Sequence, residues 1–533
     1  MEDESNPPPG LWGRVASVCD RLAAGMHRAW FVWVFLIADL YVMVAATSRR
    51  PFWYDELFTL YMTRLPTMSV IWSALKDGAD LNPPLFYVVT RLFQQLFGFS
   101  ELVTRLPAMI GFLVMMLALY RFVSRYGSRL GGMVAMTFPL VTGGFYYAQE
   151  ARGYGMELGF VATASVCWLG ATRGEKRAVN LAGLALCLAG ALLTHCYAVL
   201  AVAPFFVAEA LRTVFEKKID WPVWAALATP CTAVLTYLPL MHTVTGGPFD
   251  NPVFVRSARS SYEMMLSPAW WPLIVVLSIV ALLGSPRSGR DDSTRQIPLY
   301  EMALVAGFAA APVLGVALAA SVTKIFMDRY GLAAILGFSI ALGWLVSVRS
   351  TRRQGVGALA VLVLLGSVVW VPVDALRLAL TAKPAAPVRE FKLTDLDSKL
   401  PIVVANGLIF LEADHYESTE VTNRLFFLID RAASVQYTGT FAFAQLQDIA
   451  KWLPIRSHLE DYSAFLQAHP SFYILSDYDF PMDWAMKKMC NDGLPLNFRG
   501  QVIINGRKLL LARVETMTSD VARKAATPGP KCY

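Results

Sequence analysis

Long apolar runs, separated by short polar and charged segments, fill the first two thirds of the sequence. A helix needs roughly 20 mostly apolar residues to cross the hydrocarbon core of a bilayer, and eleven runs come close to that length. They lie near residues 30–47, 106–123, 131–148, 155–172, 178–197, 199–215, 221–240, 269–284, 300–320, 331–348 and 355–373. The pattern therefore predicts an α-helical polytopic membrane protein with about eleven transmembrane helices.

The composition agrees with this class. Hydrophobic residues make up 56% of the 533 residues and charged residues only 16%, which excludes an ordinary soluble enzyme. The net charge of +7 is spread over short loops, so we expect no nucleic-acid partner. The N-terminal segment MEDESNPPPGLWGRV is acidic and rich in proline and lacks a signal-peptide cleavage pattern, which predicts that residues 1–29 are a cytoplasmic tail before a first span that is retained.

The distribution of lysine and arginine predicts the orientation. One set of alternate short loops holds fifteen of these residues and the opposite set holds five. Cytoplasmic loops carry the excess of positive charge, so the N-terminus is expected inside and the C-terminus outside. This parity leaves no room for a further span at residues 84–99, which we interpret as an amphipathic helix at the outer surface because Arg91, Gln94 and Gln95 share one face. Residues 48–105 then form the first outer loop.

The sequence changes character after the last span. The membrane domain is predicted to cover residues 30–373, and residues 374–533 to form a linker and a soluble domain. The β-like runs PIVVAN, SFYILSD, QVIING and KLLLARV occur together with helical segments such as FAQLQDIAKWL, which predicts an extracytoplasmic α/β domain. None of the seven cysteines has the spacing of a zinc site. A disulfide between Cys490 and Cys532 is left open.

Polar residues that need an explanation collect at the predicted outer ends of the spans. Asp55 and Glu56 follow the first span directly, in PFWYDELFTLY, where a carboxylate is costly to desolvate and is usually kept for chemistry or ion handling. The alternative is that both simply lie in a wet loop. The other candidates occur in later outer segments: Asn82, Glu150, Arg152, Tyr154, His195, Tyr197, Lys324, Arg329 and Tyr330.

Each of these residues also has a structural interpretation. His195 could be a packed histidine, the cations could extend toward water from the membrane edge, and the tyrosines could belong to an aromatic belt. The convergence of acids and cations at one face favours sugar transfer from a lipid phosphate instead. Arginine and lysine would bind the phosphate and stabilise the charge of the leaving group, and Asp55 would take the proton of an acceptor hydroxyl.

These motifs resemble those of GT-C-fold glycosyltransferases of the protein O-mannosyltransferase and aminoarabinose-transferase type, which are glycosyltransferase family 39-like. The resemblance covers about residues 30–350 and follows the family's order of motifs: FWYDELFT, LNPPLFY, ELVTRLPAMIGFL, YAQEARGYGM, THCYAVL and MDRYGLAAILGF. The family usually has His or Lys before its PPL motif, whereas this chain has Asn82.

The resemblance implies an inverting enzyme at the outer face of the membrane. Its donor would be a polyprenyl-phosphate sugar and its acceptor a hydroxyl on a lipid, glycan or protein. Asp55 would be the catalytic base, and Glu56 would support that base. A single Asp-Glu pair without a DxD motif predicts no obligatory metal, with a divalent cation left open. The chain has 533 residues and lacks an insert of the mannosyltransferase type between its spans. This favours a protein of the bacterial inner or plasma membrane.

Two other classes of function are compatible with parts of the pattern. A flippase or transporter of a lipid-linked sugar would use ionisable residues inside the spans, and Asp39 and Glu157 occupy such places. A non-catalytic scaffold would not need acids and cations at one rim.

Overall fold

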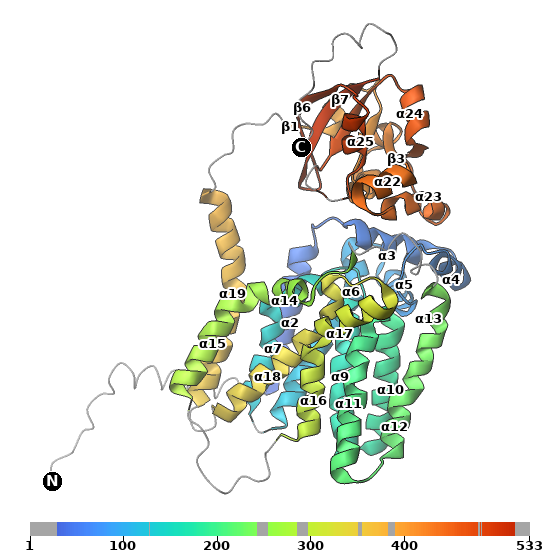
Figure 1. Cartoon of the computed structure of the whole chain (residues 1–533). Helices are drawn as coiled ribbons and strands as arrows, with labels where there is room; N and C mark the ends of the chain where they lie inside the picture. The colour runs from blue at the N-terminus through green and yellow to red at the C-terminus, as the bar shows by residue number, and fades with distance from the viewer. Residues whose placement is uncertain are drawn as a thin grey trace, which may run out of the picture. The chain divides into compact units, whose positions relative to one another are not determined.

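The computed structural model describes residues 29–126, 128–241, 254–284, 297–349, 354–381, 390–477, 480 and 482–516. The chain divides into two compact units (Figure 1). The first comprises Met1–Arg49, Asn82–Pro239 and Val255–Thr381, and the second Arg50–Leu81, Leu240–Phe254 and Ala382–Tyr533. The predicted tail of residues 1–28 lies outside the described residues, as does Cys532.

The first unit consists mainly of helices over its described length, with one isolated β-bridge between Val255 and Phe326. Its helices are α2 (Ala29–Thr47), α5 (Leu85–Phe97), α6 (Glu101–Ser124), α7 (Arg129–Thr137), α8 (Gly143–Tyr147), α9 (Tyr154–Thr172), α10 (Arg177–Thr194), α11 (Val199–Glu216), α12 (Trp221–Ala228), α13 (Val234–Met241), α14 (Ala258–Leu266), α15 (Trp270–Leu283), α16 (Leu299–Ala309), α17 (Ala311–Leu318), α18 (Ala334–Arg349) and α19 (Gln354–Thr381). The long helices run side by side in a bundle (Figure 1).

Each predicted apolar run falls on helical segments, and several runs are broken. Proline stands at three of the breaks: Pro139 and Pro230 lie in 3₁₀ turns, and Pro312 is the second residue of α17, before which the chain bends by 60°. Proline removes one backbone hydrogen bond and clashes with the preceding turn. In the part of the chain that the structure describes, five helices are long and apolar enough to cross a membrane, or six with the bent pair, so the count of eleven stays a prediction.

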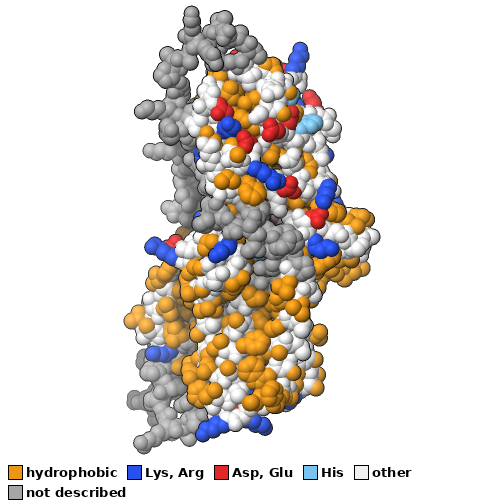
Figure 2. All heavy atoms as spheres, turned by 45° about the vertical axis from the view of Figure 1, so that its right-hand side comes forward, with side chains coloured by type: hydrophobic (Ala, Val, Ile, Leu, Met, Phe, Trp, Pro, Cys, Tyr) orange, Lys and Arg blue, Asp and Glu red, His pale blue; other side chains and the backbone are white. Residues whose placement is uncertain are grey.

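The helical unit exposes apolar side chains over a wide area. Figure 2 shows hydrophobic side chains along its flank and lysine and arginine at one end. Trp33, Ile37 and Ile274 are each more than half exposed. A soluble protein rarely leaves a contiguous apolar surface of this size in water, whereas lipid tails solvate it. This is the surface of an integral membrane protein.

Helix α5 forms where an amphipathic helix was predicted, but one of its polar residues is placed differently. Gln94 is buried, and its amide nitrogen donates to the Thr104 hydroxyl on α6 at 3.0 Å. The exposed stripe is apolar and contains Val88, Leu92 and Leu96 at a spacing of four residues. Arg91 and Gln94 are three residues apart and lie on one side of the helix, but the polar contact to α6 holds Gln94 inside instead of leaving it at the outer surface. An apolar exposed stripe suits a helix at a lipid surface.

Glycines allow α6 and α9 to approach closely. A Cβ atom on Gly111 would lie 2.4 Å from the Met156 Cα, and one on Gly155 would lie 2.2 Å from the Ala108 carbonyl oxygen. Gly159 faces the Gly111 carbonyl oxygen in the same way, at 2.4 Å. Small residues spaced by four are typical of helix contacts in membranes, where packing rather than water exclusion joins helices. This contact fixes the start of α9.

The second unit contains a seven-stranded sheet in the order β1-β6-β7-β5-β2-β3-β4. Its strands are β1 (Glu390–Phe391), β2 (Ile402–Val404), β3 (Leu425–Ile429), β4 (His458–Asp461), β5 (Ser471–Ser476), β6 (Leu496–Ile504) and β7 (Arg507–Glu515). Strands β2 to β5 are mutually parallel where they pair, with Val403 opposite Phe426 and Ile474, and β7 is antiparallel to both its neighbours.

Helices complete this unit, and the predicted α/β class is confirmed. They are α3 (Tyr54–Arg64), α4 (Met68–Lys76), α20 (Gly407–Tyr416), α21 (Thr419–Thr422), α22 (Arg431–Thr438), α23 (Leu446–Ile449), α24 (Tyr462–Ala468) and α25 (Ala485–Asn491). The run FAQLQDIAKWL forms three short helical turns rather than one helix. The tight turn between β6 and β7 is Asn505-Gly506, both with positive φ, as a two-residue hairpin requires.

The first outer loop is divided between the units. Prediction assigned all of residues 48–105 to the membrane domain, whereas Arg50–Leu81, with α3 and α4, pack with the C-terminal domain. Cys490 is disulfide-bonded, and Cys532 lies outside the described residues, so a pairing between these two cysteines stays open.

Candidate active site

Aromatic rings from three separate segments pack around His195 in the first unit. The centroid of its ring lies 5.2 Å from those of both Tyr154 and Tyr330 and 6.3 Å from that of Tyr197. Tyr197 and Tyr330 stack on each other with centroids 4.6 Å apart. The segments are the start of α9, the turn after α10 and the turn before α18. Four residues chosen from the sequence therefore form one cluster.

His195 is held by the backbone turn in which it lies. The residue has an extended conformation where α10 ends, and its Nδ1 accepts the backbone N–H of Tyr197 at 3.2 Å. The same nitrogen lies 3.4 Å from a carboxylate oxygen of Glu157 on α9. The two contacts compete for this nitrogen, because it accepts from the Tyr197 N–H only without a proton and donates to Glu157 only with one. Either contact holds the ring beside the tyrosines.

Arg329 adds a cation to the aromatic cluster. Its Nε donates to the Tyr154 hydroxyl at 2.7 Å, and its guanidinium carbon lies 5.8 Å from the centre of the Tyr330 ring. The Ser261 hydroxyl on α14 donates to the carbonyl of Asp328 at 2.6 Å, which fixes the backbone next to Arg329. A guanidinium held in this way presents a planar set of donors of the kind that binds phosphate.

The segment before Arg329 is anchored on the opposite side by Tyr197. The Tyr197 hydroxyl lies 2.5 Å from that of Thr323 and also donates to the carbonyl of Ile325. Lys324 lies between these two residues, and its side chain is exposed. Its φ is +57°, and its ammonium donates to the carbonyl of Ala320 at 3.1 Å. In this conformation Lys324 closes the helical turn before it.

The buried turn before α9 lies at the edge of the cluster. Glu150 is fully buried, Arg152 is 8% exposed, and their backbones are joined by a hydrogen bond from Arg152 N to Glu150 O of 2.7 Å. Glu150 and Arg329 both lie within electrostatic range of Tyr147, whose ring contacts that of Tyr154 at 5.7 Å. Glu150 therefore belongs to the surroundings of the cluster.

Asn82 lies at the start of the segment that leads into α5. Pro83 and Pro84 follow it, and Phe86 in the first turn of α5 packs with Met156 and borders Gly153. The start of α5 therefore adjoins the start of α9, one residue from Tyr154.

Asp55 and Glu56 lie in the second unit, in the first turn of α3. Glu56 is fully buried, and its carboxylate accepts the backbone N–H of Trp53 at 3.3 Å. Arg50 lies 3.8 Å from the other oxygen of the same carboxylate. Glu56 is thus a helix cap as well as half of an ion pair. Asp55 is only partly buried.

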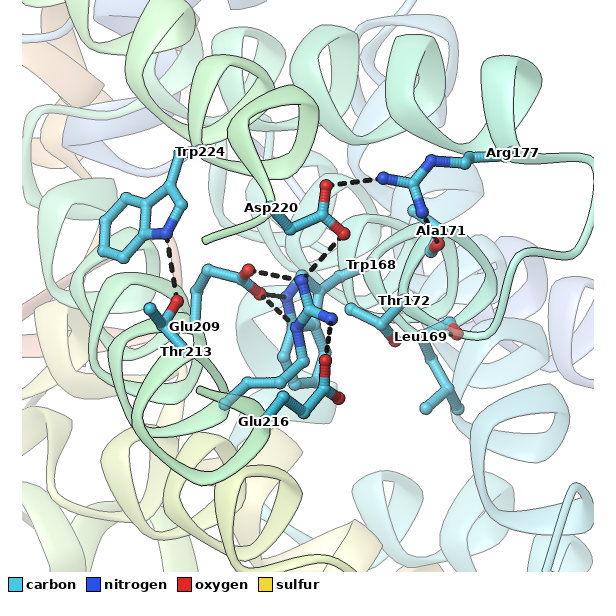
Figure 3. A network of polar contacts seen from close by, with 11 residues as sticks. Trp168, Leu169, Ala171, Thr172, Arg177, Glu209, Thr213, Glu216, Asp220 and Trp224 are labelled. Carbon is cyan, nitrogen blue, oxygen red and sulfur yellow. Dashed lines mark hydrogen bonds and ion pairs between the residues drawn. The ribbon is translucent and has the colours of Figure 1, made fainter. Parts of the chain in front are cut away.

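An ion-pair network lies at the opposite end of α11 from Tyr197 (Figure 3). Arg212 donates to both oxygens of Glu209, at 2.6 and 3.0 Å, and also binds Glu216 and Asp220 at 2.9 Å each. The indole N–H of Trp168 donates to Glu209 at 3.0 Å. Arg177 completes the network through Asp220.

The sequence interpretation treated Arg212 and Arg177 only as loop charges and missed the network around them. A glutamate inside an apolar run, with an arginine three residues later, is the signal that could have revealed it. Arg125 pairs with Glu175 at 2.9 Å, and Arg173 with the buried Glu301 at 3.3 Å. Loops predicted to share the cytoplasmic side therefore contact one another.

Among the residues that the structure describes, no group of three His, Cys, Asp or Glu side chains is placed to bind a metal ion.

Comparison with known proteins shows which family and which solved structures the chain is similar to. Residues 81–237 match the family model of the dolichyl-phosphate-mannose-protein mannosyltransferases. No curated protein matches the sequence. The structure of ArnT from Cupriavidus metallidurans in the apo state is similar, with a TM-score of 0.50 and 12% identity over 92% of this chain and 98% of that one.

A second ArnT structure from the same organism, bound to undecaprenyl phosphate, has a TM-score of 0.48 at 12% identity, over 92% of this chain and 99% of its own. The apo structure supports the fold. The chain is an integral membrane protein with the GT-C fold, and its residues 81–237 are similar to the mannosyltransferase family.

Proposed function

We propose that the protein transfers a sugar from a polyprenyl-phosphate donor to an acceptor hydroxyl at the outer face of the membrane. The observation that carries the proposal is the guanidinium of Arg329, hydrogen-bonded to Tyr154 beside His195 in a lipid-exposed helical bundle. A cation with phenol donors suits a phosphate that lies at the depth of the lipid head groups. Arg152 and Lys324 are further candidates for the same anion, with Glu150 and Asn82 beside the sugar.

The reaction is a single displacement at the anomeric carbon. The acceptor oxygen forms a bond to that carbon while its proton passes to the Asp55 carboxylate. The bond between the anomeric carbon and the phosphate oxygen breaks, and polyprenyl phosphate leaves with the electron pair. Arg329 and the phenol of Tyr154 stabilise the added negative charge on the leaving phosphate. One displacement inverts the configuration of the sugar.

Glu56 has a supporting role in this proposal. Its carboxylate is already bonded to Trp53 and paired with Arg50, so it holds the first turn of α3 rather than taking a proton. Asp55, the neighbouring acid, is the base.

The test is a transfer assay with purified protein and a panel of polyprenyl-phosphate sugars, with the product identified by its mass. Asp55→Asn is expected to lose transfer while it still binds the donor. Asp80→Asn, which removes another acid of the same loop, should keep most of the activity. Donor binding that is lost together with transfer in Asp55→Asn would contradict the role of Asp55 as the base.

A flippase is the second candidate, because Asp39 is 8% exposed within the apolar helix α2. A folded protein that transfers no sugar from any donor, but moves a labelled lipid-linked sugar across vesicles, would establish that function instead.

A further inference from the structure

The backbone just before Asp55 is fixed by three consecutive hydrogen bonds to side chains. The N–H of Phe52 donates to the Tyr416 hydroxyl at 2.6 Å, and the N–H of Tyr54 donates to the Glu412 carboxylate at 3.3 Å. Between them, the N–H of Trp53 donates to Glu56. Tyr416 and Glu412 belong to α20, more than 350 residues later in the chain. The first turn of a helix has backbone N–H groups without partners inside the helix, and here the C-terminal domain supplies one of the acceptors.

One face of α20 makes these contacts. Glu412, His415 and Tyr416 stand at i, i+3 and i+4, which places them on the same side of a helix. His415 Nδ1 lies 3.1 Å from the Tyr61 hydroxyl, and the two rings are 5.7 Å apart. Because Tyr61 lies about two turns beyond Tyr54, α20 contacts α3 at its start and near its end. A single contact would leave α3 free to pivot, whereas two separated contacts fix its direction.

Glu412 is itself held by the hairpin of β6 and β7. Asn505 donates from its amide to the carboxylate at 3.2 Å, and Arg507 lies 3.9 Å from it. Burial raises the pKa of Glu412, while Arg507 and the bond from Asn505 act in the opposite direction. A carboxylate that is 3% exposed is costly unless it is bonded. The sheet of the C-terminal domain is thus connected through Glu412 to the first residue of α3.

Further contacts join the same loop to the domain. The ring of Tyr54 meets that of Phe443 edge to face at 5.8 Å, and a Cβ atom on Gly407 would lie 2.6 Å from Phe443, so this packing requires a glycine at the start of α20. Asp77 after α4 pairs with Lys451 at 2.7 Å. Asp77 and Lys451 are exposed, and such surface pairs contribute little. The buried contacts of α20 are therefore the ones expected to matter.

We propose that α20 is a positioning device for the catalytic loop, in which Glu412, His415 and Tyr416 hold α3 so that Asp55 has the orientation needed for proton transfer. This inference rests on the proposed function, because it assigns the C-terminal domain a part in that reaction. In this proposal the three residues act through α3 and make no contact with the substrates. A displacement of about 1 Å in a catalytic group can lower a rate by about 100-fold, so a soluble domain that fixes α3 controls the rate without taking part in the chemistry.

The kinetic test uses the full-length protein and the transfer assay. Glu412→Ala combined with Tyr416→Phe removes both acceptors and is expected to lower kcat by about tenfold or more, with the KM for the donor within about twofold of the wild type. Glu412→Gln keeps an acceptor oxygen and should restore most of kcat in the Tyr416→Phe background. Tyr462→Phe is the matched control, because it removes a 2.7 Å bond to Asp492 elsewhere in the domain, and its kcat should not change.

Hydrogen exchange measured on the same variants does not depend on activity. Peptides that cover residues 52–64 should exchange faster in the double variant than in the wild type and in Tyr462→Phe, while peptides from β2 and β5 should not change. Unchanged exchange in residues 52–64 would overturn the proposal, whatever happens to kcat. Faster exchange with an unchanged kcat would also overturn it. If the wild type transfers no sugar at all, the proposed function fails, and the exchange data still show whether α20 holds α3.

Discussion

The Nε of Arg329 donates a hydrogen bond to the hydroxyl of Tyr154 at 2.7 Å, across 175 residues of sequence. A guanidinium has five donors in a rigid plane, so a bond at Nε fixes the direction of the other four. Tyr154 is 3% exposed and begins α9, which makes it a rigid support. The orientation of the cation is therefore set by a residue of a different helix, and that phenol is the first group to test.

We expect Tyr154→Phe to weaken the use of the donor. The change removes the bond to Arg329 and keeps the ring beside His195, so kcat/KM should fall about tenfold, which corresponds to about 1.4 kcal/mol for a hydrogen bond to a charged group. Tyr146→Phe is the control, since Tyr146 is 55% exposed and should lose little. An unchanged kcat/KM in Tyr154→Phe would mean that the orientation of Arg329 does not limit the reaction.

The network around Arg212 is expected to stabilise the helical bundle without affecting chemistry. Glu209→Gln removes the charge that balances a buried arginine, and breaking a buried pair in this way costs about 3 kcal/mol. The variant should melt several degrees below the wild type in detergent, while its KM for the donor remains unchanged. Arg259→Gln breaks an exposed pair with Glu263 and should melt at the wild-type temperature. A Glu209→Gln protein that melts normally but binds the donor poorly would assign the network to the active site.

Sequence patterns predicted the helices and the members of the aromatic cluster. Apolar runs identify membrane helices because lipid leaves few other ways to satisfy a backbone, and His195, Tyr154 and Arg329 could be selected from their places at the ends of those runs. What the pattern could not supply is how side chains are paired. Glutamine is a polar residue of a type usually found at the surface. Gln94 is buried through its contact with Thr104 on α6, which the sequence pattern does not show.

The division of the first outer loop could not be predicted for the same reason. The contacts of Phe52 and Tyr54 are made with residues more than 350 positions away, and no periodicity within a short window carries such information. Tyr416 and His415 lie in the segment LEADHY, which has no recognisable motif. A role for α20 becomes visible only when the loop and the domain are folded together.

Glycine at position 155 is expected to be required for the placement of Tyr154. In Gly155→Ala the new methyl group would meet the backbone oxygen of Ala108 at 2.2 Å, and a backbone atom cannot move aside cheaply. The variant should melt several degrees lower, and transfer should fall further than stability alone explains. Gly366→Ala is the matched control, because nothing lies within 4 Å of a Cβ atom there, and alanine favours a helix by up to about 1 kcal/mol. Equal melting temperatures for the two variants would contradict close packing of α6 and α9.

The stability of the C-terminal domain should depend on pH through Asp483. Its side chain is 1% exposed and accepts a hydrogen bond from Ser476 at 2.6 Å, and burial raises its pKa from 3.8 to about 7. A carboxyl group whose pKa is higher in the folded than in the unfolded protein binds more protons when folded, so its contribution to stability is complete below about pH 4 and is lost as the pH rises to about 7. Each unit of pKa difference corresponds to about 1.4 kcal/mol.

Asp483→Asn removes the charge and should therefore raise the melting temperature of the domain more at pH 8 than at pH 5, measured on the full-length protein in detergent. Asp430→Asn is the control for an acid-to-amide change in the same domain, because it keeps an oxygen at the N-cap of α22 that can accept the Ala433 N–H. Equal shifts for Asp483→Asn at both pH values would show that the carboxyl group is already ionised in the folded domain at pH 5.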